Sequence, residues 1–178
     1  MAKLLSFSGS NSKNSINKKL GQYANSLIKG HEVLAINLEE YAAPMFCIDI
    51  ENETGIPDNI KKLRELFISV DAFVITCPEH NSSMPAFFKN MMDWISRCEG
   101  VIFNKKPVLL MGTSPGARGG MGNRSNLVSI FPYWGASSVH DFGMGKFYDV
   151  FDSENNKIKD VELNEQLIQT IDEFLKVV

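Results

Sequence analysis

Three short stretches of this chain concentrate the hydroxyl, amide and glycine residues that could bind a ligand. They are Gly9–Asn17 (GSNSKNSIN), Pro78–Pro85 (PEHNSSMP) and Ser114–Gly122 (SPGARGGMG). Each follows a short apolar run typical of a buried strand, so the three stretches occupy equivalent places along the chain. Their residue types suit the binding and orientation of a polar ligand.

The first stretch opens a predicted helix and favours a phosphate. Small hydroxyl and amide side chains surround backbone N–H groups at the positive end of a helix dipole, which together suit a phosphate dianion. The stretch matches neither the GxxxxGK[ST] pattern nor GxGxxG. Because Ser and Asn also favour helix N-caps in polar turns, this stretch alone fits a phosphate site and a plain cap equally well.

The second and third stretches favour a flat ligand. Pro78 and Pro85 fix the path of a polar loop that presents backbone amides, whereas the alternative is a proline-bounded turn with an exposed His80. No second metal ligand stands at ligand spacing from His80. Four glycines between Gly116 and Gly122 allow close backbone approach to a planar group, and the alternative is a flexible turn.

Alternating apolar runs and helical patterns must position these stretches. The pattern predicts strands over 3–8, 32–37, 72–77, 107–113 and 137–142, and helices over 15–28, 57–69, 86–98, 124–134 and 163–177. This alternation predicts one α/β domain over residues 1–178, with a parallel sheet covered by helices on both faces. Ligands bind at the carboxyl ends of such strands, where the three stretches lie.

Two segments have no clear period. Residues 39–55 read as a long, partly acidic loop, whose length suggests a function or an interface. Residues 147–160 fit a surface hairpin or an irregular excursion. Residues 41–50 and the aromatic residues Phe131, Tyr133 and Trp134 have two equally good interpretations. They could form contacts in a dimer, or they could simply be buried within the chain's own core and loops.

Composition narrows the class of protein. The 178 residues carry a formal net charge of −3, which provides no basic face for nucleic acid. No apolar run approaches the roughly 18 residues that a membrane span needs, so no membrane partner is expected. Three widely spaced cysteines, Cys47, Cys77 and Cys98, predict reduced thiols in a cytoplasmic protein.

Taken together, the three stretches resemble the NAD(P)H-dependent FMN reductase family of flavodoxin-like quinone, chromate and azo-dye reductases. The family patterns are G-S-x-R-x-x-S-x-N, then P-E-Y-N-x-S-x-P followed by L-K-N-x-x-D-W, and then S-x-G-x-x-G-G. The chain matches them at Gly9–Asn17, at Pro78–Pro85 with Phe88–Trp94, and at Ser114–Gly120. The resemblance extends from the first strand to about Gly120.

The resemblance implies a flavodoxin-like three-layer sandwich with strand order 2-1-3-4-5. It implies FMN as cofactor, NADPH or NADH as cosubstrate, a quinone-like acceptor, and a homodimer or homotetramer. It implies a phosphate site at Ser10, Ser12, Ser15, Ile16 and Asn17. It places the isoalloxazine edge and ribityl side at Pro78, Glu79, His80, Asn81 and Ser82. It places the opposite border of the ring at Ser114, Pro115, Gly116 and Gly119.

Two departures from the family pattern have chemical consequences. Ser12 replaces an arginine, which removes a bidentate guanidinium–phosphate contact, although Lys13 could supply a looser point charge. We therefore expect a reduced affinity for FMN. His80 replaces a tyrosine, and this smaller ring would change access to the flavin or the acceptor preference. Arg118 could contact a nicotinamide phosphate, and its alternative is a solvated surface position.

Three functions follow from these patterns. The first is a reductase in which NAD(P)H reduces the flavin and a quinone or similar acceptor reoxidises it in ping-pong order. Its chemistry would occur on the flavin, with no catalytic side chain. The second is an FMN-binding electron carrier or redox sensor without nicotinamide activity. The third is a flavodoxin-like interaction module without cofactor.

Overall fold

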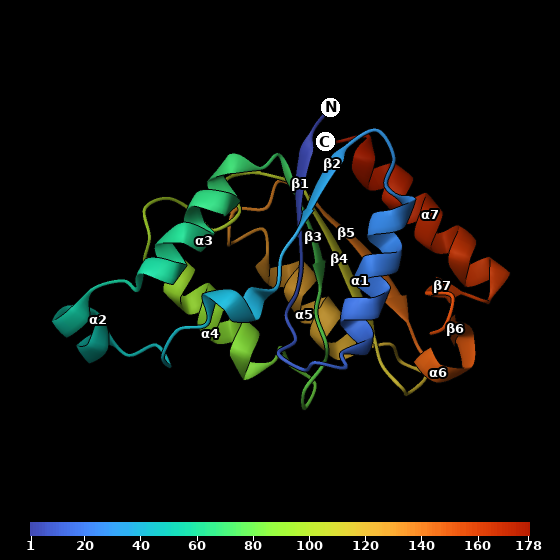
Figure 1. Cartoon of the computed structure of the whole chain (residues 1–178), viewed down its shortest axis with the longest axis horizontal. Coiled ribbons are helices and arrows are strands. Elements are labelled where there is room, and N and C mark those ends of the chain that lie inside the picture. Colours follow the sequence, from blue (N-terminus) through green and yellow to red (C-terminus); the bar gives the residue numbers. More distant parts are fainter.

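A computed structural model describes residues 1–178, and its centre is a five-stranded parallel sheet (Figure 1). The strands are β1 (Lys3–Ser8), β2 (Glu32–Ala35), β3 (Ala72–Thr76), β4 (Val108–Thr113) and β5 (Val139–Met144). Their order is β2-β1-β3-β4-β5 with every pair parallel, so the expected order and fold class are confirmed. β3 and β4 are buried along their whole length, which explains their continuous apolar sequences.

Helices cover both faces of this sheet. One face carries α1 (Ile16–Leu27) and α7 (Val161–Leu175), and the other carries α3 (Asp58–Ser69), α4 (Ala86–Ile95) and α5 (Met121–Ile130). Side chains alternate between the faces along each strand. Leu5 and Phe7 therefore belong to the core beneath α3 and α4, whereas Leu4 belongs to the core beneath α1 and α7.

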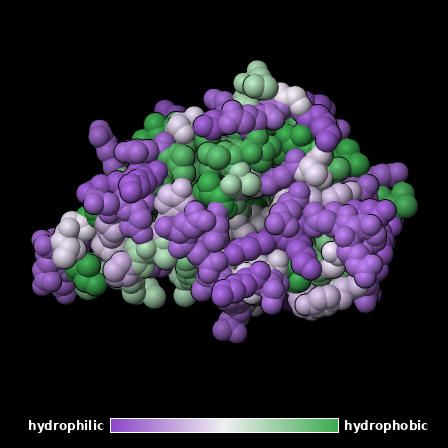
Figure 2. Space-filling view, in the orientation of Figure 1, coloured by the Kyte–Doolittle hydropathy of each residue, from purple (hydrophilic) through white to green (hydrophobic).

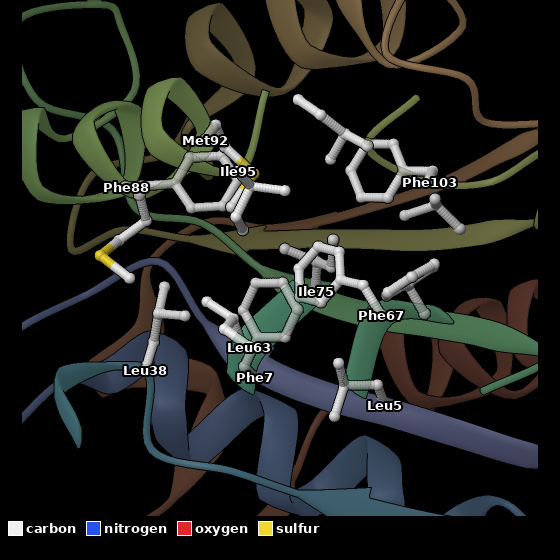
Figure 3. Close-up of a cluster of buried hydrophobic side chains, with 14 of the residues drawn as sticks. Leu5, Phe7, Leu38, Leu63, Phe67, Ile75, Phe88, Met92, Ile95 and Phe103 are labelled. Carbon is white, nitrogen blue, oxygen red and sulfur yellow. The ribbon is translucent and has the colours of Figure 1, made fainter. Parts of the chain in front are cut away.

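Aromatic rings dominate the core on the α3 and α4 side (Figure 3). Phe67 stacks on Phe7 with ring centroids 5.6 Å apart, and it packs on Phe73 at 4.9 Å. Phe103 completes this group, with its ring centroid 5.2 Å from that of Phe73. Burial of each such ring stabilises the fold by about 1.5–3 kcal/mol relative to exposure, so this cluster anchors the central strands that carry the ligand loops.

The sequence suggested one long loop over residues 39–55, and the structure instead has two short elements in this segment. It contains a 3-10 turn, η1 (Leu38–Tyr41), and a short helix, α2 (Ile48–Thr54). α2 spans only seven residues and buries none of them, so it leaves no hydrophobic period in the sequence. Gly55 ends it with a φ of 75°, a conformation that glycine adopts without strain.

α4 holds the chain between these two short elements. Asn90 accepts a hydrogen bond from Phe46 N–H (2.7 Å) and donates to the carbonyls of Ala43 and Pro44. Trp94 Nε1 also donates to Pro44 O, at 2.7 Å. The Asn and Trp that match the family pattern L-K-N-x-x-D-W therefore serve packing in this structure.

Near the C-terminus the elements differ from expectation in their bounds. Residues 147–160 form one helical turn, α6 (Phe147–Val150), and a small hairpin of β6 (Phe151–Asp152) and β7 (Lys157–Ile158). α5 begins three residues earlier than predicted, at Met121. Phe131 lies in the core and Trp134 packs against it, whereas Tyr133 is 88% exposed.

The outer surface agrees with a helix-covered sheet. Hydrophilic residues cover most of the face in Figure 2, and hydrophobic residues gather in a smaller patch at its upper middle. No helix in the structure is both long enough and apolar enough to cross a membrane.

Candidate functional site

The loops that follow the strands enclose a cavity of about 240 Å³ at the carboxyl ends of β1, β3 and β4. In Figure 1 these loops come together at the lower end of the sheet. The cavity lies where open α/β sheets bind ligands. It is lined by Ser10, Ser12, Asn14, Ser15, Ile16, Asn17, Pro78, Glu79, His80, Thr113, Ser114, Pro115 and Tyr148.

The N-terminus of α1 supplies hydrogen-bond donors to this cavity. Ser15 is the N-cap, and its Oγ accepts from Lys18 N–H at 3.2 Å. Ile16 and Asn17 occupy the first two helical positions, where backbone N–H groups have no partner within the helix. Ser10 Oγ accepts from Ser12 N–H at 3.2 Å, which shapes the turn before the helix. Free donors at a helix N-terminus attract an anion.

Asn17 fixes this helix end to the sheet. Its side chain donates to Thr113 O (3.1 Å) and accepts from Thr113 N–H (3.0 Å), and only 2% of the residue is exposed. The amide thus satisfies the last backbone groups of β4. The side chain of Asn17 is thereby engaged, and its backbone N–H has no partner within the helix.

The second predicted loop is a tight two-residue turn. His80 and Ser83 exchange backbone hydrogen bonds of 2.9 and 3.0 Å, and Asn81 and Ser82 between them have φ values of 51° and 62°. Positive φ at both central positions is characteristic of a type I′ turn. Pro78, Glu79 and His80 line the cavity, whereas Asn81 and Ser82 form the exposed tip and do not line it.

Asn123 joins the second loop to α5, and sequence reasoning missed this residue. Its backbone N–H donates to Glu79 Oε2 at 2.8 Å, and its Nδ2 donates to Pro78 O at 2.8 Å. Asn123 is fully buried in the first turn of α5, where the helix dipole favours the Glu79 carboxylate. The polar run 123–126 gave no sequence signal that distinguished this one buried amide from its neighbours.

The third loop contributes only its first part to the cavity. Ser114 and Pro115 line the cavity, and Gly116 and Gly119 do not. Gly119 is buried with a φ of 56°, and a Cβ there would approach the backbone of Met144 and Gly145 within 2.8–3.0 Å. Its glycine is therefore required for packing against the end of β5. Arg118 is exposed and forms no ion pair in the structure.

Tyr148 lines the cavity and was not predicted, together with Asn14 and Thr113. It is 68% exposed and belongs to α6, which is anchored by a hydrogen bond from Phe147 N–H to Ser114 O (3.1 Å). Phe147 itself is fully buried. Residues 147–150 show no hydrophobic period in the sequence. The only signal that could have indicated Tyr148 was an aromatic residue shortly after the last strand.

Cys77 lies beneath the first loop, since a Cβ on Gly9 would approach its Sγ at 3.1 Å. Burial raises the pKa of the Cys77 thiol to about 12, and a hydrogen bond from Asn123 Nδ2 only partly offsets this effect. The thiol therefore stays protonated at neutral pH and is not a nucleophile. The arrangement around the cavity is suited to ligand binding.

Comparison with known proteins identifies relatives of this chain. Residues 2–149 match the NADPH-dependent FMN reductase family. The chain is 30% identical over 119 residues to a quinone reductase of Escherichia coli K12, an alignment that covers 66% of this chain and 63% of that protein. It is 32% identical over 118 residues to an NAD(P)H-dependent FMN reductase of Pseudomonas aeruginosa, covering 66% and 62%. The alignments thus span less than two thirds of these relatives.

Solved structures share the fold over nearly the whole chain. The flavoenzyme NAD(P)H:(acceptor) oxidoreductase FerB from Paracoccus denitrificans superposes with a TM-score of 0.79 at 22% identity, covering 99% of this chain and 97% of that chain. An NADH:FMN oxidoreductase in its apo form gives a TM-score of 0.73 at 18% identity, covering 100% and 91%. These likenesses confirm the flavodoxin-like fold, and the match over residues 2–149 shows that the chain belongs to the NADPH-dependent FMN reductase family.

Proposed function

We propose that this chain binds FMN in the cavity and uses NADPH or NADH to reduce a quinone-like acceptor. The observation that carries the proposal is the cluster of unpartnered donors at the N-terminus of α1, open to a cavity between the second and third loops. Membership of the NADPH-dependent FMN reductase family supports FMN as the ligand.

The donor set fits a flavin phosphate. Hydroxyl groups of Ser10, Ser12 and Ser15 and the first backbone N–H groups of α1 line one side of the cavity. The only carboxylate in the lining, Glu79, is held by Asn123 N–H at the start of α5. A phosphate dianion would therefore meet donors and the positive helix end.

The remaining lining residues would hold the ring and its ribityl chain. Pro78, Glu79 and His80 would face the isoalloxazine edge, and Ser114 and Pro115 would border it from the other side. Asn81 and Ser82 would meet the ligand at the rim from the tip of their turn. Gly119 would act by giving the third loop its shape, and Gly116 would border the ring through its backbone.

Bound FMN supplies hydride acceptance from NAD(P)H and electron delivery to a quinone, in two half-reactions. Pro78, Glu79, His80, Ser114 and Pro115 would orient the ring for both substrates. His80 is exposed at the cavity mouth, so it would contact the incoming acceptor. Arg118, exposed in the third loop, is the proposed contact for a nicotinamide nucleotide phosphate.

Ser12 offers a matched pair of variants for testing the phosphate site. Ser12→Arg restores the family residue and should tighten FMN binding by about tenfold, because a guanidinium binds phosphate bidentately. Ser12→Asp should weaken binding by at least as much through repulsion. Ser12 is exposed, so neither change disturbs the core, and Ser26→Asp on α1 away from the cavity is the control.

The test is a titration of the purified full chain with FMN, followed by flavin fluorescence, and then an assay of NADPH and NADH oxidation with menadione. We expect a yellow protein that oxidises a reduced nicotinamide nucleotide only when both FMN and the quinone are present. A chain that fails to bind FMN overturns the proposal and favours an interaction module. A yellow chain without nicotinamide activity would instead be an electron carrier or sensor.

A further inference from the structure

The lining of the cavity at the ends of β1, β3 and β4 contains one carboxylate and neither lysine nor arginine. Glu79 is the only acidic residue among the 13 that form the lining, and His80 and Tyr148 are its other titratable residues. Lys13 and Arg118 belong to the ligand loops but do not line the cavity. A ligand that becomes more negative in this cavity therefore meets a negative side chain and no permanent cation.

Contacts with α5 hold the Glu79 carboxylate in place. Its Oε2 accepts the hydrogen bond from Asn123 N–H at 2.8 Å, and Gly122 leaves room for it, because a Cβ there would approach the same oxygen at 2.9 Å. Asn123 is fully buried and donates from Nδ2 to the carbonyl of Pro78, which precedes Glu79 in the chain. The negative charge is thus held at one place in the cavity wall.

Neighbouring groups cancel only part of this charge. Asn123 lies in the first turn of α5, and a helix N-terminus is equivalent to roughly +0.5 elementary charge, so about half of the negative charge remains. Arg124, the next residue of α5, is already paired with Asp141 and donates to Gly119 O. Glu79 itself forms no ion pair in the structure.

The function proposed above requires extra negative charge in this cavity. A hydride from NADPH or NADH carries two electrons and one proton to the bound flavin, and NADP⁺ or NAD⁺ leaves, so one net negative charge is added. A quinone then takes the two electrons and that proton, and a second proton from water completes the hydroquinone. Between these two steps the added charge and Glu79 repel each other, more strongly than in bulk water because the effective dielectric constant is lower.

We propose that Glu79 sets the redox preference of the bound flavin, by disfavouring its reduced form relative to its oxidised form. The inference rests on the proposed binding of FMN and assigns the residue that tunes its reduction potential. A like charge in the lining should make about a tenfold difference between the affinities for the two forms, which equals about 30 mV for a two-electron couple. A flavin of lower potential passes electrons on more readily, so Glu79 favours acceptors that are themselves hard to reduce.

Glu79→Gln tests this role, because it removes the charge and keeps an oxygen that can accept from Asn123 N–H. The affinity of the full chain for oxidised FMN is measured by fluorescence titration. The reduction potential of the bound FMN is measured by anaerobic equilibration with a reference dye. We expect the variant to bind oxidised FMN within about threefold of the parent chain and to raise the potential by about 30 mV, which is tenfold tighter binding of reduced FMN.

Glu162→Gln is the matched control, since Glu162 is an exposed carboxylate in the first turn of α7 and does not line the cavity. It should leave the potential unchanged. Hydrogen exchange of the Asn123 amide in the ligand-free chain, labelled with ¹⁵N, should be equally slow in the parent chain and in Glu79→Gln, which shows that only the charge was changed.

The outcomes separate this role from FMN binding itself. An unchanged potential in Glu79→Gln, with oxidised FMN still bound, would overturn the role of Glu79 and leave the proposed function standing. A rise in potential that Glu162→Gln shares, or that accompanies loss of Asn123 protection, would also overturn it, in favour of net charge or of a structural role. A parent chain that binds no FMN overturns both proposals.

Discussion

The clamp between Asn17 and Thr113 leads to a prediction that separates two roles of the same residue. If Asn17 only contacted a flavin phosphate, Asn17→Ala would leave the stability of the ligand-free chain unchanged. The structure instead places its side chain in two hydrogen bonds, of 3.1 and 3.0 Å, to the backbone of Thr113. We therefore expect Asn17→Ala to destabilise the chain without any ligand.

The magnitude follows from the groups that the substitution leaves unpaired. Asn17 is 2% exposed and Thr113 is also 2% exposed, so water has little access to the released N–H and C=O. Each of the two unsatisfied buried groups costs about 1–3 kcal/mol, which gives a loss of roughly 2–6 kcal/mol in the free energy of unfolding. For a chain of this size, such a loss lowers Tm by roughly 4–24 °C.

Urea unfolding of the ligand-free protein, followed by the fluorescence of Trp94 and Trp134, measures this difference. Asn14→Ala is the matched control, because Asn14 lines the same cavity but is exposed and its side chain makes no hydrogen bond. We expect the control to remain within about 0.5 kcal/mol of the parent chain. An equally small effect of Asn17→Ala would refute the assignment of its side chain to the clamp.

Four further outcomes are expected. Gly143→Ala should lower the free energy of unfolding by about 1 kcal/mol in urea, because its Cβ would displace the Arg124 guanidinium from its partners Gly119 O and Asp141; Gly116→Ala, with open space around it, is the control. The pKa of Cys77 is raised from 9.0 to about 12, so the stability of the folded chain should fall between pH 9 and 12, by up to about 1.4 kcal/mol per pH unit, and Cys77→Ala should lessen that slope in urea titrations across this range. Tyr148→Ala should weaken FMN binding by about tenfold in fluorescence titrations, whereas Tyr133→Ala, outside the cavity, should not. Arg118→Ala should raise the KM for NADPH with little change in kcat, and an unchanged KM would remove that residue from nucleotide binding.

Periodic patterns predicted the parallel sheet and short motifs predicted the position of the cavity, whereas the strand order came from the family resemblance. Ten of the fourteen predicted site residues line the cavity. The other four lie in the right loops without lining the cavity: Asn81 and Ser82 form the tip of a turn, Gly119 packs against the end of β5, and Gly116 has open space around it. Motif matching identifies a loop, whereas the direction of each side chain depends on backbone φ and on contacts between distant segments.

Two residues near the cavity could not be predicted from hydrophobic periods or short motifs. Asn123 contacts Pro78 over 45 positions along the chain, and α6, which carries Tyr148 to the cavity, is anchored by the hydrogen bond from Phe147 N–H to Ser114 O over 33 positions. α2 was missed for a different reason, since a helix with no buried residue has no hydrophobic period. The sequence thus predicts elements that bury a face and misses the single side chains that join loops.

The anchoring of the α1 N-terminus by Asn17 has a thermodynamic consequence for any ligand of that cavity. Thr113 is fixed on both sides, because it pairs with Asn17 and its Oγ1 also donates to Met144 O at 2.7 Å. The donor groups are therefore preorganised before a ligand arrives, and folding has already met the entropic cost of ordering them. Binding would then retain more of its interaction free energy as affinity, which would offset part of the affinity that we expect Ser12 to cost.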